Sequence, residues 1–330
     1  MSVLLKVGLA LVSLWSSLSL AEGNYAVNPA ALALIDELVE EQAFDRQQLI
    51  AVFAEVEKKE SILEAMSRPA EKTKPWYDYR KIFVTEKRER QGLEFMAKHK
   101  ETLERAEREL GVPAEMIAAI IGVETYYGRI TGSYRVIDAL STLAFDYPKR
   151  SVFFTKELKS FLILSRDQGF DPLELMGSYA GAMGYGQFMP SSYRAYAIDF
   201  DGDGKIDIWN NPVDAIGSVA NYFKHHGWRT GEPVVFAANV TDPVTEEIFN
   251  QSLKPGKSVI EFAEAGVSVS TEPPLDPNSM ATAMKFEIEQ GYEYWLGLHN
   301  FYVITRYNHS SMYAMCVYQL SQLLAAQVAE

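Results

Sequence analysis

The chain has 330 residues, which is enough for about two domains with well-formed cores. Hydrophobic residues make up 48% and charged residues 23%, as in an ordinary globular protein. The formal net charge of −13 argues against nucleic acid or an anionic membrane surface as the main partner, and it suits a protein that binds a divalent cation. The only cysteine, Cys316, excludes an internal disulfide and lies in an apolar helical pattern, which favours a buried thiol.

Residues 1–21 have the pattern of an export signal. Lys6 is the only charge, residues 7–15 are apolar, and a small-x-small cleavage site at 19–21 precedes Glu22. The apolar run is too short to span a bilayer comfortably, and no cysteine lies near the cleavage site for lipid attachment. We therefore expect a periplasmic protein that is soluble after signal removal, with a retained N-terminal anchor as the alternative.

Helical patterns at 30–41, 45–57 and 62–66 predict an N-terminal α-domain over residues 22–85. An aromatic and basic connector, residues 74–83, closes this region. It is either a packing segment or it places Tyr79 at a ligand cleft, and the composition does not decide between the two.

The stretch from Pro113 to Arg129, PAEMIAAIIGVETYYGR, follows a long helix of mixed charge predicted at 85–110. Gly111 ends that helix, Pro113 takes the first position of the next one, and apolar residues on nearly every side predict a buried helix. Its last turn holds Glu124 near the negative end of the helix dipole. Desolvation and the dipole both penalise the charged form, so Glu124 is a candidate general acid. The alternative is a structural glutamate that bonds a backbone N–H or an arginine.

A helix over 136–145 is followed by a break and by a further helix that runs to Asp167. Lys149 and Arg150 lie at the start of this second helix. They are either ligands for an anionic group or an exposed helix start.

Residues 178–192, SYAGAMGYGQFMPSS, hold three glycines within six residues, which allow positive φ angles and close approach of a ligand. The stretch lacks the spacing of a dinucleotide loop and the lysine of a P-loop, so phosphate binding is disfavoured. Ser178, Tyr185 and Gln187 offer hydroxyl and amide groups to a sugar. A tight structural loop closed by Pro190 is the alternative.

Residues 199–210, DFDGDGKIDIWN, match the start of a calcium loop. The carboxylates alternate and a glycine provides the turn at position six, as wrapping oxygens around a hard cation requires: Asp199, Asp201, Asp203 and Gly204. Asn210 occupies position 12, where an acidic residue is expected, and Asp214 is the candidate that closes the site. We expect one structural Ca²⁺, against the alternative of a solvated acidic turn.

A helix at 212–226 ends the helical part, and its two histidines lack a zinc-binding pattern. Short β-branched or alternating runs separated by Pro and Gly then predict a small β-rich domain over 231–294. An apolar helix at 311–328 should return to the core. No run in the chain predicts a transmembrane helix.

Four stretches, in this order, resemble the membrane-bound lytic murein transglycosylase B family: IIGVETYYGR, GAMGYGQFMPSSYRAYAIDFDGDGKIDIW, DAIGSVANYFKHHGW and NFYVITRYNHSSMYAM. The resemblance covers the chain from near Tyr79 to the C-terminus. It implies a mainly α fold, in which a lysozyme-like helical core over 86–230, with an EF-hand-like loop at 199–214, carries an additional α-domain and a small inserted β-domain. The segment 295–330 would return to that core.

The resemblance also implies cleavage of the β-1,4 bond between N-acetylmuramic acid and N-acetylglucosamine in peptidoglycan. Glu124 would protonate the glycosidic oxygen and then act as base, while the C6 hydroxyl of muramic acid closes onto C1 to give a 1,6-anhydro sugar. A single acid agrees with the sequence. Most glycosidases need a second carboxylate at a set separation, and the nearest downstream candidates, Asp138 and Asp146, lie in no comparable motif.

Residue roles follow from the same resemblance. Ser178 would contact Glu124, and the cleft would be lined by Gln187, Phe188 and Met189. Sugar rings and N-acetyl groups would be bound by Tyr79, Tyr222, Tyr307, Asn308 and Tyr313. Lys149 and Arg150 would face the peptide stem or lactyl carboxylate, where the family has two arginines. The calcium ligands would be Asp199, Asp201, Asp203, Lys205 through its carbonyl, and Asp214.

Two other functions stay open: a muramidase that admits water, and a non-catalytic glycan-binding protein. We expect the glycan strands and peptide stems of peptidoglycan as partners, and complexes with other cell-wall enzymes would fit. Nucleic acid is not an expected partner. We expect a monomer.

Overall fold

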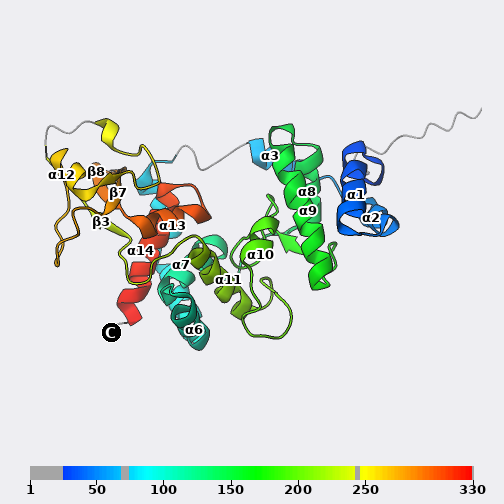
Figure 1. Cartoon of the computed structure of the whole chain (residues 1–330), viewed down its shortest axis with the longest axis horizontal. Helices are drawn as coiled ribbons and strands as arrows, with labels where there is room; N and C mark the ends of the chain where they lie inside the picture. The colour runs from blue at the N-terminus through cyan, green and yellow to red at the C-terminus, as the bar shows by residue number, and fades with distance from the viewer. Residues whose placement is uncertain (1–24, 68–73, 242–245, 329–330) are drawn as a thin grey trace, which may run out of the picture.

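The computed structural model describes residues 25–67, 74–241 and 246–328. The predicted export signal, residues 1–21, lies outside the described residues. Helices dominate the described part, and the longer strands gather in one small region at an end of the molecule (Figure 1). The predicted mainly α class with a small β-domain is therefore confirmed.

The N-terminal helices form one lobe together with two helices from the middle of the chain (Figure 1): α1 (Pro29–Gln42), α2 (Arg46–Ala54), α3 (Glu60–Ser67), α8 (Val136–Phe145) and α9 (Ser151–Gln168). A short 3-10 turn, Tyr25–Val27, precedes them. Side chains of Asn28 and Asp45 accept backbone N–H groups at the starts of α1 and α2, as N-caps do. α1 packs against α9 and α3 against α8, so this lobe joins segments far apart in the sequence.

The second lobe is built around one buried helix. Its members are α4 (Trp76–Phe83), α5 (Glu86–Lys98), α6 (Lys100–Leu110), α7 (Ala114–Thr125), α11 (Pro212–His225), α13 (His299–Tyr307) and α14 (Ser311–Val328). α7 packs against α5, α6, α11 and α14. Ile117, Ile120 and Ile121 are fully buried, as the apolar run predicted.

A short helix and a two-stranded ladder connect the lobes: α10 (Pro190–Tyr196), β1 (Tyr134–Arg135) and β2 (Met176–Gly177). α10 lies between α9 and α11 and packs against both (Figure 1). Glu157, which is buried on α9, accepts hydrogen bonds from the backbone N–H of Ser191 at 2.9 Å and from its hydroxyl at 2.7 Å. This carboxylate therefore fixes the start of α10, directly after the glycine-rich loop.

The β-domain has an antiparallel sheet in the order β3-β8-β7-β5, built from β3 (Val235–Ala237), β5 (Lys257–Ser258), β7 (Met280–Ile288) and β8 (Gly291–Gly297). Three smaller elements cover it: β4 (Asn239–Val240), β6 (Val267–Ser268) and α12 (Val259–Glu264). Its side chains form a second hydrophobic cluster that includes Phe249, Phe262 and Leu296. The strands reach Gly297, three residues beyond the predicted boundary at 294.

Two local predictions need correction, and the structure also shows which element the connector over residues 74–83 forms. The helix predicted over 85–110 is two helices that meet at His99, whose φ of −113° and ψ of 24° leave the helical region. The break turns the buried Leu103 and Ala106 of α6 toward α7 and α11. Pro113 occupies the N-cap of α7, one position before the predicted one. The connector is a helix, α4, which packs against α14 and β7.

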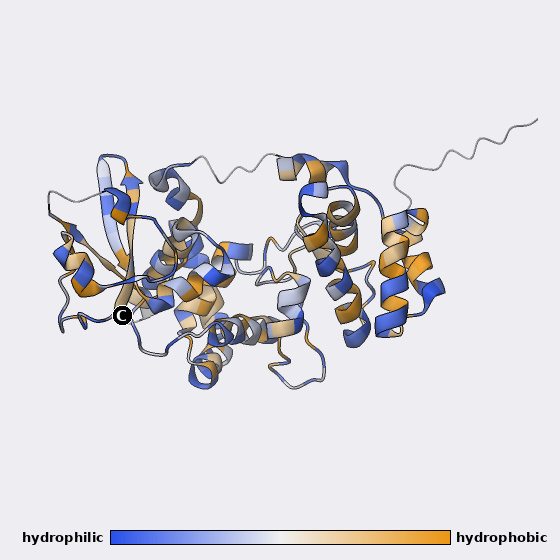
Figure 2. Ribbon diagram, turned by 45° about the horizontal axis from the view of Figure 1, so that its top comes forward, coloured by the Kyte–Doolittle hydropathy of each residue, from blue (hydrophilic) through white to orange (hydrophobic). Residues whose placement is uncertain are grey.

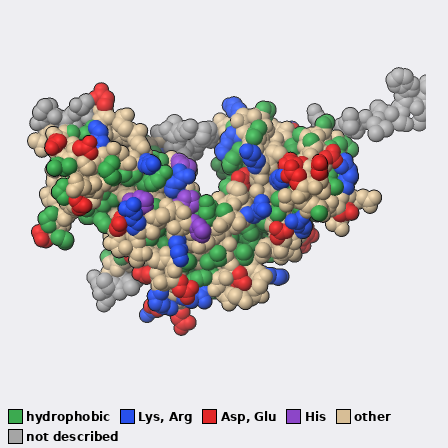
Figure 3. Space-filling view, viewed as in Figure 1, with side chains coloured by type: hydrophobic (Ala, Val, Ile, Leu, Met, Phe, Trp, Pro, Cys, Tyr) green, Lys and Arg blue, Asp and Glu red, His purple; other side chains and the backbone are tan. Residues whose placement is uncertain are grey.

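Hydrophobic and charged residues are distributed as expected for a globular protein of this composition. Hydrophobic residues gather where helices pack, and hydrophilic residues cover their outer sides (Figure 2). Charges of both signs are interspersed on the face that Figure 3 shows, and this face is hollowed between the two lobes. Of the helices that the structure describes, none combines the length and apolar character needed to cross a bilayer.

The single cysteine is buried as expected. Cys316 lies on α14 with no exposed surface, and burial raises the pKa of its thiol to about 12. The thiol is therefore protonated at neutral pH and contributes to the core as a small hydrophobic side chain.

Candidate active site

Helix α7 places Glu124 at the edge of the core. The three residues before Glu124 and the one after it are buried, while Glu124 itself is partly exposed. The carboxyl group therefore emerges from an apolar helix end that the surrounding helices hold in place. This is the placement expected for a general acid, and it differs from an open surface position.

The chain leaves α7 through a strained turn. Tyr126 and Tyr127 have φ angles of 56° and 61°, in the left-handed region that side chains other than glycine rarely adopt. Each such residue costs about 1–2 kcal/mol. The Thr125 hydroxyl supports the turn, because it accepts a hydrogen bond from the Gly128 N–H at 3.0 Å and lies 2.9 Å from the carbonyl oxygen of Tyr185.

The glycine-rich loop packs directly on this turn. The Tyr185 ring covers Gly128, where an added Cβ would lie 2.1 Å from it. Gly184 has a φ of 66°, and an added Cβ there would meet the carbonyl oxygen of Ile208 at 2.4 Å. The loop thus needs glycine for close packing between the Glu124 turn and the acidic loop.

The polar residues of this loop satisfy its own backbone. The Ser178 hydroxyl accepts hydrogen bonds from the N–H groups of Ala180 and Ala182, at 3.3 and 3.0 Å. The Gln187 amide donates to the carbonyl oxygens of Thr131 and Gly184. Both side chains therefore have the structural role that the alternative interpretation assigned to them, and their predicted contact with substrate stays a prediction.

Tyr313, from α14, contacts the candidate acid. Its hydroxyl donates a hydrogen bond to Oε1 of Glu124 at 2.5 Å, and its side chain is 3% exposed. Burial raises the pKa of Tyr313 well above its usual value, and the nearby Glu124 charge raises it further. The hydroxyl therefore stays protonated and serves as a donor to the carboxylate.

Tyr307, at the end of α13, also lies near Glu124. Burial is the main cause that raises the pKa of Tyr307 well above its usual value, and the charge of Glu124 is the second. Among the residues that the structure describes, Glu124 is the one carboxylate that acts on both Tyr307 and Tyr313. The Tyr307 hydroxyl donates to the carbonyl oxygen of Gly186 at 2.6 Å, so α13 and the glycine-rich loop are tied together.

Aromatic rings surround this group. Phe188, Tyr222 and Tyr307 contact one another, with ring centroids 4.7 to 6.0 Å apart. Tyr79, from α4, is 3% exposed and lies close enough to Tyr313 to raise its pKa. The structure thus brings together six predicted site residues from six segments: Tyr79, Glu124, Phe188, Tyr222, Tyr307 and Tyr313.

The remaining predicted ligands lie further out. Asn308 is exposed directly after Tyr307, and Met189 is partly buried at the start of α10. Lys149 and Arg150 are exposed in a 3-10 turn between α8 and α9, on the other lobe. Within the described residues neither side chain has an ion pair, so both charges are available to an anionic ligand.

The two candidate second carboxylates have structural partners instead. Asp138 is 1% exposed, and its oxygens accept hydrogen bonds from Arg135 at 2.8 and 2.9 Å and from the Glu57 N–H at 3.0 Å. Asp146 accepts a hydrogen bond from the Tyr25 hydroxyl at 2.6 Å. Both hold the N-terminal lobe together, which leaves Glu124 as the candidate acid.

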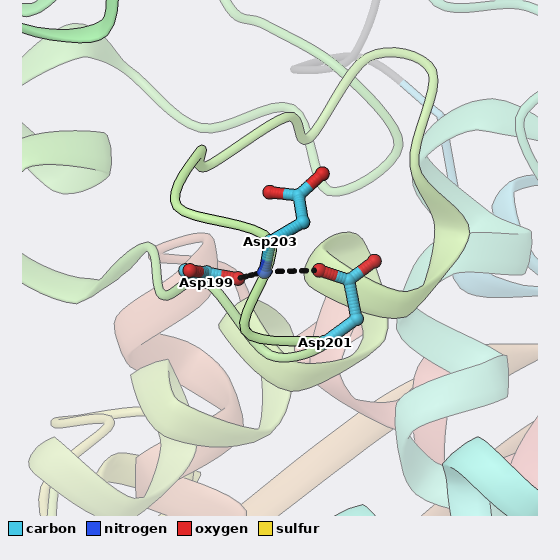
Figure 4. Close-up of side chains that lie close together, drawn as sticks. All are labelled: Asp199, Asp201 and Asp203. Carbon is cyan, nitrogen blue, oxygen red and sulfur yellow. Dashed lines mark hydrogen bonds between the residues drawn. The ribbon is translucent and has the colours of Figure 1, made fainter.

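The acidic loop forms a compact cluster of oxygens. Asp199, Asp201 and Asp203 each offer one carboxylate oxygen, and these three oxygens lie within 4.8 Å of one another. Figure 4 shows the Asp203 N–H donating to the carboxylates of Asp199 and Asp201, at 3.2 Å each. Asp199 also accepts the N–H groups of Gly202 and Gly204, and the Gly204 bond is the main cause that lowers its pKa. A hard cation such as Ca²⁺ prefers this donor set.

Asp214 holds the acidic loop through hydrogen bonds to its backbone. It is fully buried at the start of α11, and its two oxygens accept the N–H groups of Phe200 at 2.7 Å and Asp207 at 2.8 Å. It therefore joins the two ends of the loop. The roles of Asp214 and of the Lys205 carbonyl as metal ligands stay predictions.

Two supporting residues had no recognisable signal in the sequence. Thr125 is 1% exposed and fastens the turn after Glu124 to the glycine-rich loop. Arg88 is 5% exposed, although it falls in a run of charges that predicted a solvated helix face. Its guanidinium lies 4.1 Å from the ring centre of Tyr126.

Comparison with known proteins identifies the family. Residues 27–322 match the model of the transglycosylase SLT domain. The chain belongs to this family. It is also 47% identical over 312 residues to the membrane-bound lytic murein transglycosylase B of Escherichia coli (strain K12), which covers 92% of this chain and 84% of that protein.

Solved structures of transglycosylases are similar over nearly the whole chain. The catenated lytic transglycosylase SltB1 from Pseudomonas aeruginosa has a TM-score of 0.88 and 54% identity, and the match covers 92% of this chain and 99% of that one. The Escherichia coli lytic transglycosylase Slt35 in complex with bulgecin A has a TM-score of 0.86 and 46% identity, and covers 93% and 96%. The predicted family, enzyme class and lysozyme-like fold are thereby confirmed.

Replacing Tyr313 with phenylalanine tests its contact with Glu124. A hydrogen bond to a charged group is worth about 1.5–3 kcal/mol, so we expect kcat to fall about tenfold or more while the ring preserves the packing. The matched control is Tyr318→Phe, on the same helix, whose hydroxyl has no hydrogen bond within the described residues. Initial rates on a defined glycan substrate check this, and equal rates for the two variants would refute the assigned role of Tyr313.

Proposed function

We propose that this transglycosylase cleaves the β-1,4 bond between N-acetylmuramic acid and N-acetylglucosamine in peptidoglycan, with Glu124 as the single acid and base. The observation that carries the proposal is the placement of Glu124. It lies at the end of a buried helix, next to the buried Tyr313 and the partly buried Tyr307, and the two downstream candidate carboxylates hold other parts of the fold. The names of its relatives, lytic murein transglycosylases, support the substrate class.

In the proposed reaction, Glu124 first donates a proton to the substrate and then accepts one from it. In the first step the Glu124 carboxyl protonates the glycosidic oxygen, the bond from C1 of muramic acid to that oxygen breaks, and N-acetylglucosamine leaves with its C4 hydroxyl restored. In the second step the Glu124 carboxylate takes the proton of the C6 hydroxyl, and the C6 oxygen bonds to C1. Glu124 returns to its starting state, and no water is consumed.

The surrounding residues suit a glycan. Phe188, Tyr222 and Tyr307 provide aromatic surface beside the candidate acid, and Tyr313 holds the carboxyl in place. The unpaired cations of Lys149 and Arg150 would attract carboxylates of the peptide stem. A relative of known structure supports this ligand class: SltB3 from Pseudomonas aeruginosa, 32% identical with a TM-score of 0.79, is described in complexes with NAG-anhNAM-pentapeptide and NAG-NAM-pentapeptide.

Hydrolysis is the second candidate, because a similar structure is described as a muramidase/transglycosylase, with a TM-score of 0.85 and 46% identity. The first step would be the same. Water would then replace the C6 hydroxyl and leave a reducing end, so the product would be heavier by one water molecule. The partial burial of Glu124 and the aromatic rings around it favour exclusion of water and hence the anhydro product.

We also propose that the acidic loop binds one Ca²⁺ with a structural role. The three clustered carboxylates repel one another without a cation, and Asp199, Asp201 and Asp203 supply the oxygens that Ca²⁺ prefers. The structure of Slt35 in complex with calcium, 46% identical with a TM-score of 0.85, supports the choice of metal. Because Gly184 packs against the carbonyl of Ile208, an ordered acidic loop would also support the glycine-rich loop.

The cellular setting stays a prediction. The export pattern at residues 1–21 and a peptidoglycan substrate both favour the periplasm. We also predict that the protein is a monomer and that it forms complexes with other cell-wall enzymes.

Replacing Glu124 with glutamine tests the assigned acid. The amide keeps the shape but cannot donate the proton, so we expect turnover of purified sacculi to fall by about 10²- to 10⁴-fold. Binding to sacculi should be preserved. The matched control is Glu115→Gln, at the other end of α7, where burial raises the pKa of the Glu115 carboxyl. Turnover by Glu124→Gln at the rate of this control would refute the proposal.

Metal exchange tests the calcium site. Ca²⁺ at 100 times its Kd would stabilise the folded state by about 2.7 kcal/mol relative to chelator, which corresponds to a rise in Tm of about 4 °C for a chain of this length. Asp201→Asn should lose this response, and Asp171→Asn, an exposed aspartate outside the loop, should keep it. Equal Tm values in Ca²⁺ and in chelator would refute the proposed calcium site.

A further inference from the structure

The turn that follows Glu124 has strained backbone. Tyr126 and Tyr127 are consecutive residues with positive φ, in positions where glycine is normally preferred. Strain of this kind persists only when the surrounding structure holds it, and it concentrates at functional sites. Packing fixes α7 itself, and the contacts that hold these two tyrosines contribute to the orientation of its last turn, which carries Glu124.

Helix α5 supplies these contacts. The Tyr127 ring packs on Phe95 with a centroid distance of 5.5 Å and lies over Gly92, where an added Cβ would be 2.4 Å from its hydroxyl. The Tyr126 ring lies under the guanidinium of Arg88, at 4.1 Å, and the Lys87 ammonium is 5.6 Å from the same ring. A desolvated cation over a tyrosine face is attracted to it more strongly than an exposed one.

Arg88 is also fixed from its other side. Its Nη1 donates hydrogen bonds to the carbonyl oxygens of Ile82 and Phe83, at 2.7 and 2.8 Å, and these residues form the last turn of α4. The guanidinium lies 5.4 Å from the Phe83 ring centre as well. Arg88 thus connects the helix that carries Tyr79 to the turn that follows Glu124.

The partners of Arg88 are unusual for a buried cation. Its side chain is 5% exposed, and the groups that act on its charge are Tyr126, Tyr127 and Cys316, with no carboxylate among them in the described part of the chain. Its Nε has no hydrogen-bond partner among the residues that the structure describes. Burying an arginine without an acid costs free energy, and the contacts that offset this cost are the two carbonyl hydrogen bonds at the end of α4 and the stack on Tyr126.

We propose that Arg88 is a positioning residue, whose guanidinium holds the strained Tyr126 turn and thereby orients the Glu124 carboxyl toward the glycosidic oxygen. It acts through Tyr126. The inference rests on the proposed role of Glu124 as the acid. Because misorientation of a bound acid slows the chemical step more than it weakens binding, the effect belongs in kcat and not in KM.

The test compares Arg88→Met with an arginine in the other lobe. Arg166 on α9 also lies on an aromatic ring and bonds a helix end: its guanidinium lies 4.4 Å from the Phe44 ring centre and donates to the carbonyl of Gln42, the last residue of α1. Unlike Arg88, it is exposed and pairs with Asp167, so it controls for the loss of an arginine that bonds a helix end away from Glu124. We expect Arg88→Met to lower kcat at least tenfold with KM within twofold, measured on a defined glycan oligomer well below Tm. Arg166→Met should keep the kcat of the unmodified protein.

Variants of Tyr126 test the connection itself. Tyr126→Phe keeps the stacked ring and should behave as the unmodified protein. Tyr126→Gly removes the ring and the strain together, so the turn is freed and kcat should fall as in Arg88→Met. The double variant Arg88→Met/Tyr126→Gly should have a kcat no lower than that of the slower single variant, because both substitutions remove the same contact.

The outcomes distinguish the positioning role of Arg88 from the proposed role of Glu124 as the acid. A folded Arg88→Met protein with kcat within twofold of the unmodified protein overturns the role of Arg88, even when Glu124→Gln is inactive. If Arg88→Met does not fold, an unchanged kcat in Tyr126→Gly overturns it instead. Activity in Glu124→Gln would refute the assigned acid, whatever the Arg88 variants do.

Discussion

Burial of α7 is the constraint on which the rest of the site depends. The helix is surrounded by α5, α6, α11 and α14, and its isoleucines are fully buried. Each buried side chain of this size contributes about 1.5–3 kcal/mol, so the helix cannot shift without a large loss of stability. The helix end, and with it Glu124, is therefore fixed by packing. A carboxyl held at such an end meets the two needs of a general acid, which are an apolar surrounding and a defined direction.

Segments that are distant in the sequence complete the site around this helix end. Tyr313 contacts the carboxyl from α14, Tyr307 ties α13 to the glycine-rich loop, and Tyr185 from that loop covers Gly128. The loop is supported in turn by the acidic loop, through the contact of Gly184 with Ile208. A metal in the acidic loop would thus stabilise the site from a distance and take no part in proton transfer.

The sequence predicted the elements with strong local signals and missed those set by tertiary contacts. The apolar run of α7, the glycine-rich loop and the alternating aspartates each carry their pattern within a few residues, and the structure has them where they were expected. Nothing local marks the break at His99 or the left-handed tyrosines. The burial of Arg88 is set by an aromatic ring about forty residues away, so its charged neighbours predicted a solvated face. The role of Tyr313 came from the family resemblance alone.

The central claim is that one carboxyl group acts twice while the substrate supplies its own nucleophile, so that water never enters the product. Digestion of sacculi in water enriched in ¹⁸O, followed by mass spectrometry of the released muropeptides, measures this directly. The account predicts muramic acid ends that carry no ¹⁸O and are lighter than the hydrolysis product by one water molecule. Reducing ends that carry one ¹⁸O atom as the main product would contradict it.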